Sequence, residues 1–391
     1  MKRIVTAILI TVLLLQTCSC IRVVDGGYRP GWQQSESATQ YAESSPTFSE
    51  IPFYPAWSKD TATAKAFLSL KDAVVDVSER EYSYGEMAED LAVLKSRYPT
   101  LMDYYSIGKS VVGRELYVAR VGNPNAKQQI LVSAGIHGRE YLTPLLAMKQ
   151  IEFLLAYHES GVCVTVTYAT LLEAFCFYVV PMSNPDGIML AQEGIRSVSD
   201  RSLYDKLYAV YHKDYEGKYT QQTDINEYFK IWKSNANAVD LNRNFDAGWD
   251  DVDTGMQRPS HKNYKGSSAA SEPETQALAT LVNSLPNIRA VLCIHSQGEV
   301  LYWNCGQEAV LRDQTLRFTE MLAARTGYEI RPEQNNDASF SDWCALKKGL
   351  IAVTVETGLG TCPLDISQFS TIWADHYDLL VRSAVYFSAE P

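Results

Sequence analysis

Two kinds of apolar pattern alternate along most of this chain. Short continuous apolar runs, such as residues 130–134 and 290–294, are typical of strands that are buried on both faces of a sheet. Between such runs, apolar residues recur at helical spacing, as in residues 144–158. Strands that alternate with helices predict an α/β fold. We expect a single three-layer α/β/α domain with a mixed, largely parallel central sheet.

The expected elements follow from these patterns and from the turn-forming residues between them. Strands are expected at residues 101–107, 115–121, 128–136, 175–181, 290–295 and 350–355, with a hairpin turn at Gly113. Helices are expected at residues 87–98, 144–158, 271–285, 309–326 and 369–387. Residues 183–187 are dense in turn formers and predict a loop, and the polar, Tyr-rich residues 191–232 are interpreted as an insertion.

The N-terminus has the pattern of an export signal. Lys2 and Arg3 precede an apolar run at residues 4–15, which is too short to span a bilayer, and Cys18 and Cys20 follow it. This order resembles the lipobox of bacterial lipoproteins, with Cys20 preferred for lipidation because a small Ser precedes it. The alternative is a short buried N-terminal helix.

The domain boundaries follow from this interpretation. Residues 1–20 are expected to be a lipoprotein-type signal peptide, residues 21–78 a tether, and residues 79–391 the folded domain. An aromatic cluster at residues 53–57 either belongs to the tether or docks on the domain. We expect an exported protein of the cell envelope, either attached to the membrane only through a lipid anchor or secreted.

Charge and cysteine content exclude some classes of protein. The net charge is −11, and removal of Lys2 and Arg3 gives −11 − 2 = −13, which argues against binding to nucleic acid. Six cysteines outside the signal permit three disulfides, without fixing their pairing, but contain no CxxC pair for a structural zinc cluster. Cys293 lies inside an expected core strand and is predicted to be a free, buried thiol. The others are Cys163, Cys176, Cys305, Cys344 and Cys362.

Two of the apolar runs are followed by residues of types that commonly bind zinc. His137 and Glu140 follow residues 130–134, and His295 follows residues 290–294. The carboxyl ends of parallel strands are where open α/β sheets bind ligands. Two His and one Glu are a common ligand set of hydrolytic zinc sites, in which one position stays open for water. We therefore expect these three residues to bind one Zn²⁺ ion.

Four sequence blocks, in this order along the chain, resemble the zinc carboxypeptidases of the carboxypeptidase A type. The resemblance covers the chain from about Tyr82 to the C-terminus and implies a zinc carboxypeptidase-like fold, peptide hydrolysis and zinc ligation by His137, Glu140 and His295. The blocks are Gly135-Ile136-His137-Gly138-Arg139-Glu140, Val239-Asp240-Leu241-Asn242-Arg243-Asn244-Phe245-Asp246, Ile294-His295-Ser296 and Thr354-Val355-Glu356-Thr357-Gly358.

The resemblance also implies roles for residues that do not bind the metal. Glu356 matches the family's general base, which takes a proton from the attacking water and gives it to the leaving amine. Asn242 and Arg243 match the pair that binds the substrate's free carboxylate, and Arg139 supplies a further positive group. The structural alternatives are a Glu356 that closes its strand by pairing with an Arg, an Asn242 that orders its loop, and an Arg243 paired with Asp240 or Asp246.

Two positions depart from the family's pattern. Lys233 follows Trp232 where the family has an Arg that polarises the scissile carbonyl, and a Lys is a point charge instead of a planar fork. Gln334 stands where counting back from a Trp places the family's mobile Tyr, although Tyr328 could substitute for it. The four remaining histidines lie in polar sequence and are expected at the surface: His158, His212, His261 and His376.

Residues 296–303 resemble a run in the γ-D-glutamyl-diamino acid peptidases, a bacterial branch of the family that acts on peptidoglycan stem peptides. This makes Gln297 and Glu299 candidates for shaping the substrate site; the alternative is a turn without ligand contact. The expected activity is zinc-dependent hydrolysis of a stem-peptide bond, and the alternative is an ordinary carboxypeptidase. A non-catalytic envelope binding protein is a third interpretation, and residues 191–232 could add an interaction surface.

Overall fold

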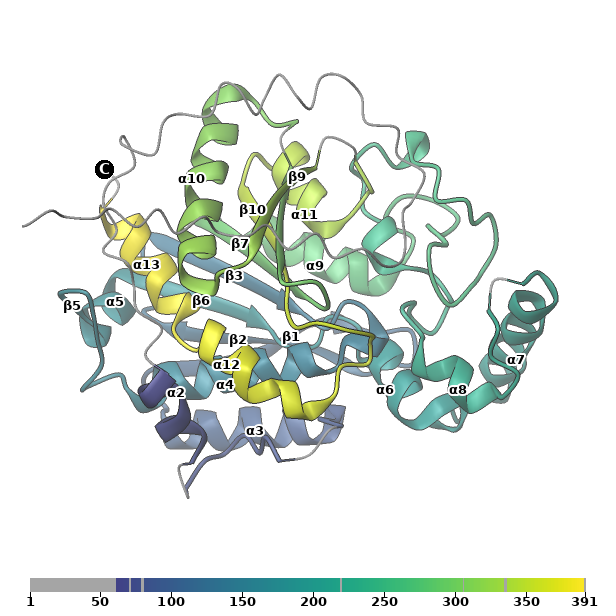
Figure 1. Cartoon of the computed structure of the whole chain (residues 1–391), viewed down its shortest axis with the longest axis horizontal. Coiled ribbons are helices and arrows are strands. Elements are labelled where there is room, and N and C mark those ends of the chain that lie inside the picture. The colour runs from purple at the N-terminus through teal and green to yellow at the C-terminus, as the bar shows by residue number, and fades with distance from the viewer. Residues whose placement is uncertain are drawn as a thin grey trace, which may run out of the picture. The chain divides into compact units, whose positions relative to one another are not determined.

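An eight-stranded mixed sheet forms the centre of the fold, in the order β1-β2-β6-β3-β7-β10-β8-β9 (Figure 1). Its four inner strands are mutually parallel: β6 (Phe175–Val180), β3 (Gln128–Ala134), β7 (Ile288–His295) and β10 (Ile351–Glu356). The outer strands are β1 (Met102–Lys109), β2 (Glu115–Gly122), β8 (Val300–Asn304) and β9 (Glu329–Glu333). β1, β2 and β6 pair antiparallel, as do β8 and β10, whereas β9 is parallel to β8. The predicted mixed, largely parallel sheet is confirmed.

This computed structural model describes residues 61–69, 72–78, 81–218, 220–304, 306–333 and 336–389. The expected signal peptide with Cys18 and Cys20, the tether up to residue 60 with its aromatic cluster, Cys305 and Gln334 lie outside the described residues. Within the described ranges, no helix has the length and apolar character needed to cross a membrane.

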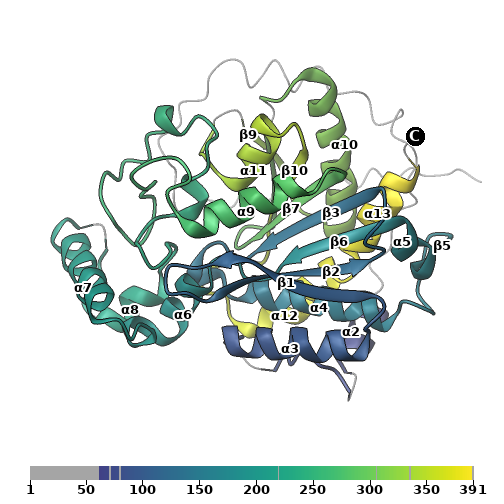
Figure 2. The same ribbon diagram turned by 180° about the vertical axis from the view of Figure 1, so that it is seen from behind.

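Helices cover both faces of the sheet, as Figures 1 and 2 show for α3 and α4 on one side and α9 and α11 on the other. Alternate strand residues point to opposite faces, so Ile130 and Val132 pack in one apolar cluster and Leu131 in the other. The first face is covered by α3 (Tyr84–Arg97), α4 (Leu142–Ala156), α10 (Ala309–Thr326), α12 (Phe369–His376) and α13 (Leu379–Ala389). The second is covered by α9 (Pro273–Ser284), α11 (Phe340–Asp342) and the π-helical turn Trp343–Lys347.

The folded domain begins before the expected boundary at residue 79. α2 (Thr61–Leu68) lies within the segment expected to be a tether, and its Phe67 is fully buried. The Phe67 ring stacks on Trp373, with 5.6 Å between centroids, and meets the edge of Phe153 at 5.0 Å. Trp373 Nε1 also donates a hydrogen bond to the carbonyl oxygen of Ala64. Two buried residues thus hold this helix to the core. They are too few to give the sequence a recognisable helical spacing of apolar residues.

The expected insertion folds into helices with an apolar cluster of its own. Its elements are α7 (Arg201–Glu216) and α8 (Ile225–Lys230), which lie at one side of the sheet together with α6 (Pro185–Glu193), the helix that leads into the insertion (Figures 1 and 2). Leu190, Leu207 and Trp232 are buried in this cluster. The predicted loop at residues 183–187 is wrong beyond Asn184, because the Asn184 side chain accepts a hydrogen bond from Gly187 N and caps α6.

Other differences concern the C-terminal half. The expected helix 369–387 is two helices, α12 and α13, and Asp378 between them binds Arg325 and Arg382. Strands β8 and β9 were not predicted. α5 (Tyr168–Ala174) and the two-residue strands β4 (Val162–Cys163) and β5 (Val166–Thr167) form a small addition before β6. The predicted turn at Gly113 is confirmed, because Gly113 has φ 91° and its N–H donates to the Ser110 carbonyl.

The described cysteines form no disulfide. Cys163, Cys176, Cys293, Cys344 and Cys362 are all free and buried, which confirms the prediction for Cys293. Two of the four histidines expected at the surface are instead buried: His261 and His376. His376 Nδ1 bonds to the Ile372 carbonyl within α12. Its polar neighbours in the sequence gave no sign that it is a core residue.

Candidate active site

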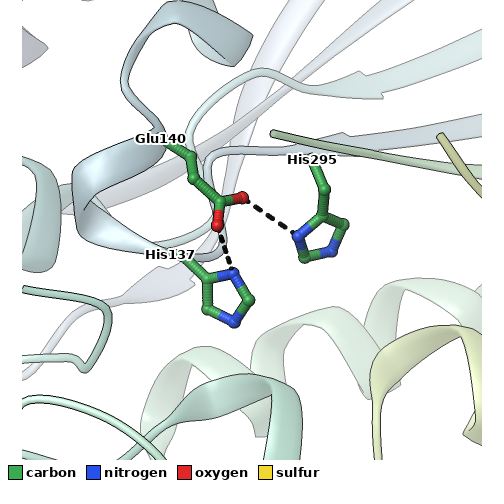
Figure 3. Close-up of side chains that lie close together, drawn as sticks. All are labelled: His137, Glu140 and His295. Carbon is green, nitrogen blue, oxygen red and sulfur yellow. Dashed lines mark hydrogen bonds and ion pairs between the residues drawn. The ribbon is translucent and has the colours of Figure 1, made fainter. Parts of the chain in front are cut away.

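The three expected metal ligands meet at the carboxyl edge of the sheet (Figure 3). β3 and β7 are paired in register up to Ala134 and Ile294. β7 therefore ends in His295 next to the loop that carries His137 and the 3-10 turn Gly138–Glu140. Candidate ligand atoms of the three residues all lie within 4.8 Å of one another, and all three side chains are buried.

The geometry of these donors fits a bound divalent cation. Glu140 Oε1 lies 2.8 Å from His137 Nδ1, and Oε2 lies 3.1 Å from His295 Nδ1. Burial opposes ionisation of Glu140, but the two facing imidazoles hold its pKa well below the usual range. Ser296 N also donates to Glu140 Oε2 at 3.2 Å. A buried, ionised carboxylate between two imidazoles is a donor set suited to zinc.

Asp240 lies against His137 on the side of the ring that faces away from Glu140 and orients the ring. Its Oδ1 lies 3.3 Å from His137 Nε2, the nitrogen that faces away from Glu140. Asp240 is itself held by the backbone N–H groups of Asn242 and Asn263. Although burial opposes its ionisation, His137 and then Arg243 hold the pKa of Asp240 below its usual range. A carboxylate on Nε2 leaves Nδ1 free to bind metal.

The loop that carries His137 is tied to two other segments. The fully buried Asn184 side chain donates from Nδ2 to the carbonyl oxygens of Ile136 and Ser234, at 3.0 and 3.1 Å. Gly138 packs so closely on α6 that a Cβ there would clash with the Gly187 carbonyl oxygen. These contacts hold the ligand loop on the start of α6 and on the chain around residue 234.

Glu356 is the last residue of β10 and pairs in register with His295 of β7. It therefore lies beside the metal ligands, as its position after an apolar run predicts. Its Oε2 atom is buried and makes no hydrogen bond, and the described residues include no arginine paired with it. Burial is the main cause that raises the pKa of Glu356 to about 7, with Glu140 adding to the shift. Such a carboxyl can both accept and release a proton near neutral pH.

Lys233 lies at the edge of the metal site, with its Nζ 4.0 Å from Glu140 Oε1. Its backbone N–H, like that of Ser234, donates to the carbonyl oxygen of His261. His261 is buried and bonds through Nδ1 to Asp214 Oδ2 at 2.9 Å. His261, expected at the surface, thus anchors the segment that presents Lys233.

Asn242 and Arg243 lie on the 3-10 turn Leu241–Arg243. Asn242 Oδ1 accepts a hydrogen bond from Phe340 N at 3.1 Å, which orders the loop and leaves the amide nitrogen for other partners. Arg243 pairs with Asp337, at 3.1 Å, and not with Asp240 or Asp246, the partners named in the structural alternative. Its side chain is 23% exposed, and its Nη1 donates to the Asn242 carbonyl oxygen at 2.8 Å.

The remaining candidates differ in their surroundings. Arg139 is half-buried, and its Nε makes no hydrogen bond to the described residues. Gln297, two residues after the ligand His295, is exposed, and Glu299 has a left-handed backbone with φ 52°. Tyr328 is buried, and its hydroxyl lies 2.9 Å from Thr357 Oγ1. It is therefore fixed in the core and does not match a mobile tyrosine.

Several residues that shape the site had no clear signal in the sequence. Asp240 lies in a motif block, but the sequence suggests for it only a pairing with Arg243. Asn184 lies in the segment predicted to be a loop, although an Asn-Pro pair is a signal for a helix N-terminus. Asp214 lies in the insertion without any motif.

Comparisons with known proteins agree with this geometry. Residues 87–376 match the family model described as zinc carboxypeptidase. Gamma-D-glutamyl-L-diamino acid endopeptidase 1 of Lysinibacillus sphaericus is 31% identical over 299 residues, which cover 76% of this chain and 70% of that protein. Carboxypeptidase B of Bos taurus is 27% identical over 218 residues, 53% of this chain and 43% of that protein.

Solved structures show the same fold at low sequence identity. The crystal structure of carboxypeptidase A from Helicoverpa armigera superposes with a TM-score of 0.61 at 17% identity, and covers 85% of this chain and 80% of that chain. The structure of thrombin activatable fibrinolysis inhibitor gives a TM-score of 0.62 at 18% identity, with 84% and 81% covered. The central sheet and its covering helices are thus an arrangement found in solved carboxypeptidases.

Proposed function

This chain belongs to the zinc carboxypeptidase family and is a zinc metallopeptidase, and from that premise we propose that it hydrolyses a peptide bond in bacterial peptidoglycan stem peptides. The bond we propose joins a γ-D-glutamyl residue to a diamino acid. The convergence of His137, Glu140 and His295 beside the half-buried Glu356 carries the assignment as a hydrolase. The similarity to an endopeptidase named for γ-D-glutamyl-L-diamino acid bonds supports the substrate class.

The family uses one zinc ion, and the three ligands described above fit it. When bound, zinc supplies a Lewis acid that lowers the pKa of the attacking water and polarises the carbonyl. In our proposal, Glu356 takes the proton from that water and transfers it to the leaving amine. Lys233 places a positive charge beside the developing oxyanion, because its Nζ lies at the edge of the ligand set.

Asn242 and Arg243 are proposed to bind the substrate's carboxylate. The Asn242 amide nitrogen and the partly exposed Arg243 side chain offer donors on the same turn. Asp337 holds one side of the guanidinium in place, which orients the donors that remain. Arg139 is proposed to contact the substrate as well, since its Nε makes no hydrogen bond to the described part of the chain. Gln297, exposed two residues after His295, is proposed to shape the substrate site.

The place of action is proposed from the N-terminal sequence alone. A lipoprotein-type signal at residues 1–20, with lipidation at Cys20 or Cys18, would hold the enzyme at the cell envelope, where peptidoglycan is found. We expect labelled fatty acid to be incorporated in the bacterial host, and substitution of both cysteines to abolish it.

A defined peptide containing the γ-D-glutamyl-diaminopimelate bond tests the proposed activity. We expect hydrolysis at that bond, identified by the masses of the two fragments. Activity should be lost after zinc is removed by chelation and return when zinc is added. Full activity in protein shown by elemental analysis to contain no metal would reject the proposed chemistry.

The second candidate function is the removal of C-terminal residues from ordinary peptides. The similarity to carboxypeptidase B and the pair Asn242 and Arg243 favour it. Kinetics on a C-terminally blocked murein peptide and on an unblocked L-peptide separate the two functions. A higher kcat/KM for the L-peptide would replace our proposal with this one.

A further inference from the structure

A buried acid of the insertion binds a neighbouring segment of the chain. Asp214, on α7, is fully buried, and its Oδ2 accepts hydrogen bonds from the hydroxyls of Tyr228 and Ser260, each at 2.7 Å. The same oxygen accepts from His261 N at 3.1 Å and lies 2.9 Å from His261 Nδ1. Asp214 Oδ1 accepts from Arg258 Nη1 at 2.8 Å. Although burial opposes ionisation of this carboxyl, the hydrogen bonds from His261, Ser260 and Tyr228 hold its pKa below the usual range. A charged, buried carboxylate thus fixes both the backbone and the ring of His261.

This segment binds the backbone of Lys233. The His261 carbonyl oxygen accepts hydrogen bonds from Lys233 N at 2.9 Å and from Ser234 N at 3.1 Å. Ser234 Oγ donates to the Ser260 carbonyl oxygen at 2.7 Å. On the other side, the Lys233 carbonyl oxygen accepts from Gly138 N, in the loop of the metal ligands, at 3.1 Å. Lys233 therefore lies between the segment held by the buried acid and the loop of the metal ligands.

The position of the Lys233 backbone decides where the charge of this residue lies. Its Nζ is 4.0 Å from Glu140 Oε1, and its side chain is 22% exposed. A Lys side chain is a point charge on a flexible stem, without the planar fork that would hold an Arg in one orientation. The backbone that carries the stem therefore has to be fixed. Misplacement of a catalytic group by about 1 Å can cost on the order of 100-fold in rate.

We propose that Asp214 is a positioning residue for Lys233, and that through His261 it holds the Lys233 backbone where Nζ reaches the developing oxyanion. This inference rests on the proposed function, which assigns that charge to Lys233. The hydrogen-bond partners of Asp214 named above include no zinc ligand and no residue proposed to contact the substrate. Its effect on the rate must therefore pass through the segment at residues 260–261 and Lys233. In this proposal the insertion is part of the catalytic apparatus.

A purely structural role of Asp214 makes a different prediction. If Asp214 only stabilised the insertion, its loss would lower the activity by the same factor whether or not Lys233 is present. If it positions Lys233, its loss should have no further effect on the rate once the lysine charge is gone. A double-mutant cycle separates the two roles, because residues that act through one another give non-additive changes.

The cycle compares wild type, Asp214→Asn, Lys233→Gln and the double variant, with kcat and KM measured on the γ-D-glutamyl-diaminopimelate peptide. Rates are expressed per folded, zinc-bound chain, from unfolding in urea and elemental analysis. We expect Asp214→Asn to lower kcat by about 10- to 100-fold and to change KM by less than about twofold, because the residues proposed to bind the substrate remain. The double variant should be as fast as Lys233→Gln to within about twofold.

Tyr228→Phe is a milder variant that decides the test if Asp214→Asn does not fold. It removes one hydrogen bond to the acid and leaves the buried ring in place. We expect kcat to fall by about two- to tenfold, and this loss also to vanish in the Lys233→Gln background. Asp205→Asn removes an exposed carboxylate of the same helix and is the matched control, which should keep the wild-type kcat.

The outcomes separate the inference from the function on which it rests. Equal losses in both backgrounds, or a wild-type kcat in Asp214→Asn and Tyr228→Phe, would overturn the inference and leave the proposed function intact. A wild-type kcat in Lys233→Gln would remove the role proposed for that lysine and the inference with it, but not the hydrolysis. No cleavage of the peptide by zinc-loaded wild-type enzyme would overturn the proposed function itself.

Discussion

Replacement of Glu356 by Gln tests the proposed proton transfer most directly. The amide has nearly the shape of the carboxyl, and Glu356 Oε2 makes no hydrogen bond that the substitution would break. The zinc ligands are other residues, so zinc content should stay at one ion per chain. The substitution removes the proton acceptor. Such a group contributes roughly 10²- to 10⁴-fold to the rate, or about 3–5 kcal/mol to the activation free energy of hydrolysis.

The assay measures kcat and KM on the γ-D-glutamyl-diaminopimelate peptide, with zinc determined by elemental analysis. We expect kcat to fall by several orders of magnitude while KM changes little, because the substrate contacts remain. Glu329→Gln, on the exposed edge strand β9, removes a carboxylate outside the site and should behave as wild type. A Glu356→Gln variant with wild-type kcat and full zinc would show that another group accepts the proton.

Three further substitutions test the metal site, the domain boundary and a buried acid. His295→Ala should lower zinc content and activity together, measured by elemental analysis and turnover, because it removes one of three ligands. Phe67→Ala should reduce the free energy of unfolding in urea by about 3–5 kcal/mol, since the ring is fully buried against Trp373; an unchanged value would place α2 outside the core. Burial raises the pKa of Glu274 to about 7, so its contribution to stability is present below about pH 4.5 and is lost as the pH rises to 7. In the wild type, the free energy of unfolding should therefore fall by about 3 kcal/mol between pH 4.5 and pH 7 through this group, and Glu274→Gln should remove that fall. A variant whose stability changes with pH as the wild type's does would contradict this.

The sequence predicts the central part of the fold because its strands are buried on both faces. The runs that became β3, β7 and β10 are nearly pure apolar sequence, and each leads to a ligand or to Glu356. The positions of these residues in the sheet edge follow from topology alone, since parallel strands end at the same edge. That His137, Glu140 and His295 lie together, with Glu356 on the neighbouring strand, could therefore be predicted without knowledge of any distance.

The elements that the sequence did not reveal are held by few or polar contacts. α2 depends on Phe67 and Ala64, and β9 is an edge strand of mostly half-buried or exposed residues. The insertion's anchor at Asp214 is a polar network, which leaves no apolar period. Likewise, the pairing of Arg243 with Asp337 joins residues far apart in the chain, so no local pattern predicts it.

The buried amide of Asn184 affects how the loop that carries the metal ligands is held in position. Because it binds Ile136 at the start of the ligand loop and Ser234 on a neighbouring segment, the loop is held by the protein's own hydrogen bonds. The conformational entropy of that loop, about 1–2 kcal/mol per residue, is therefore lost on folding. We expect removal of zinc to stop catalysis and leave the protein folded, so that added zinc restores activity without refolding.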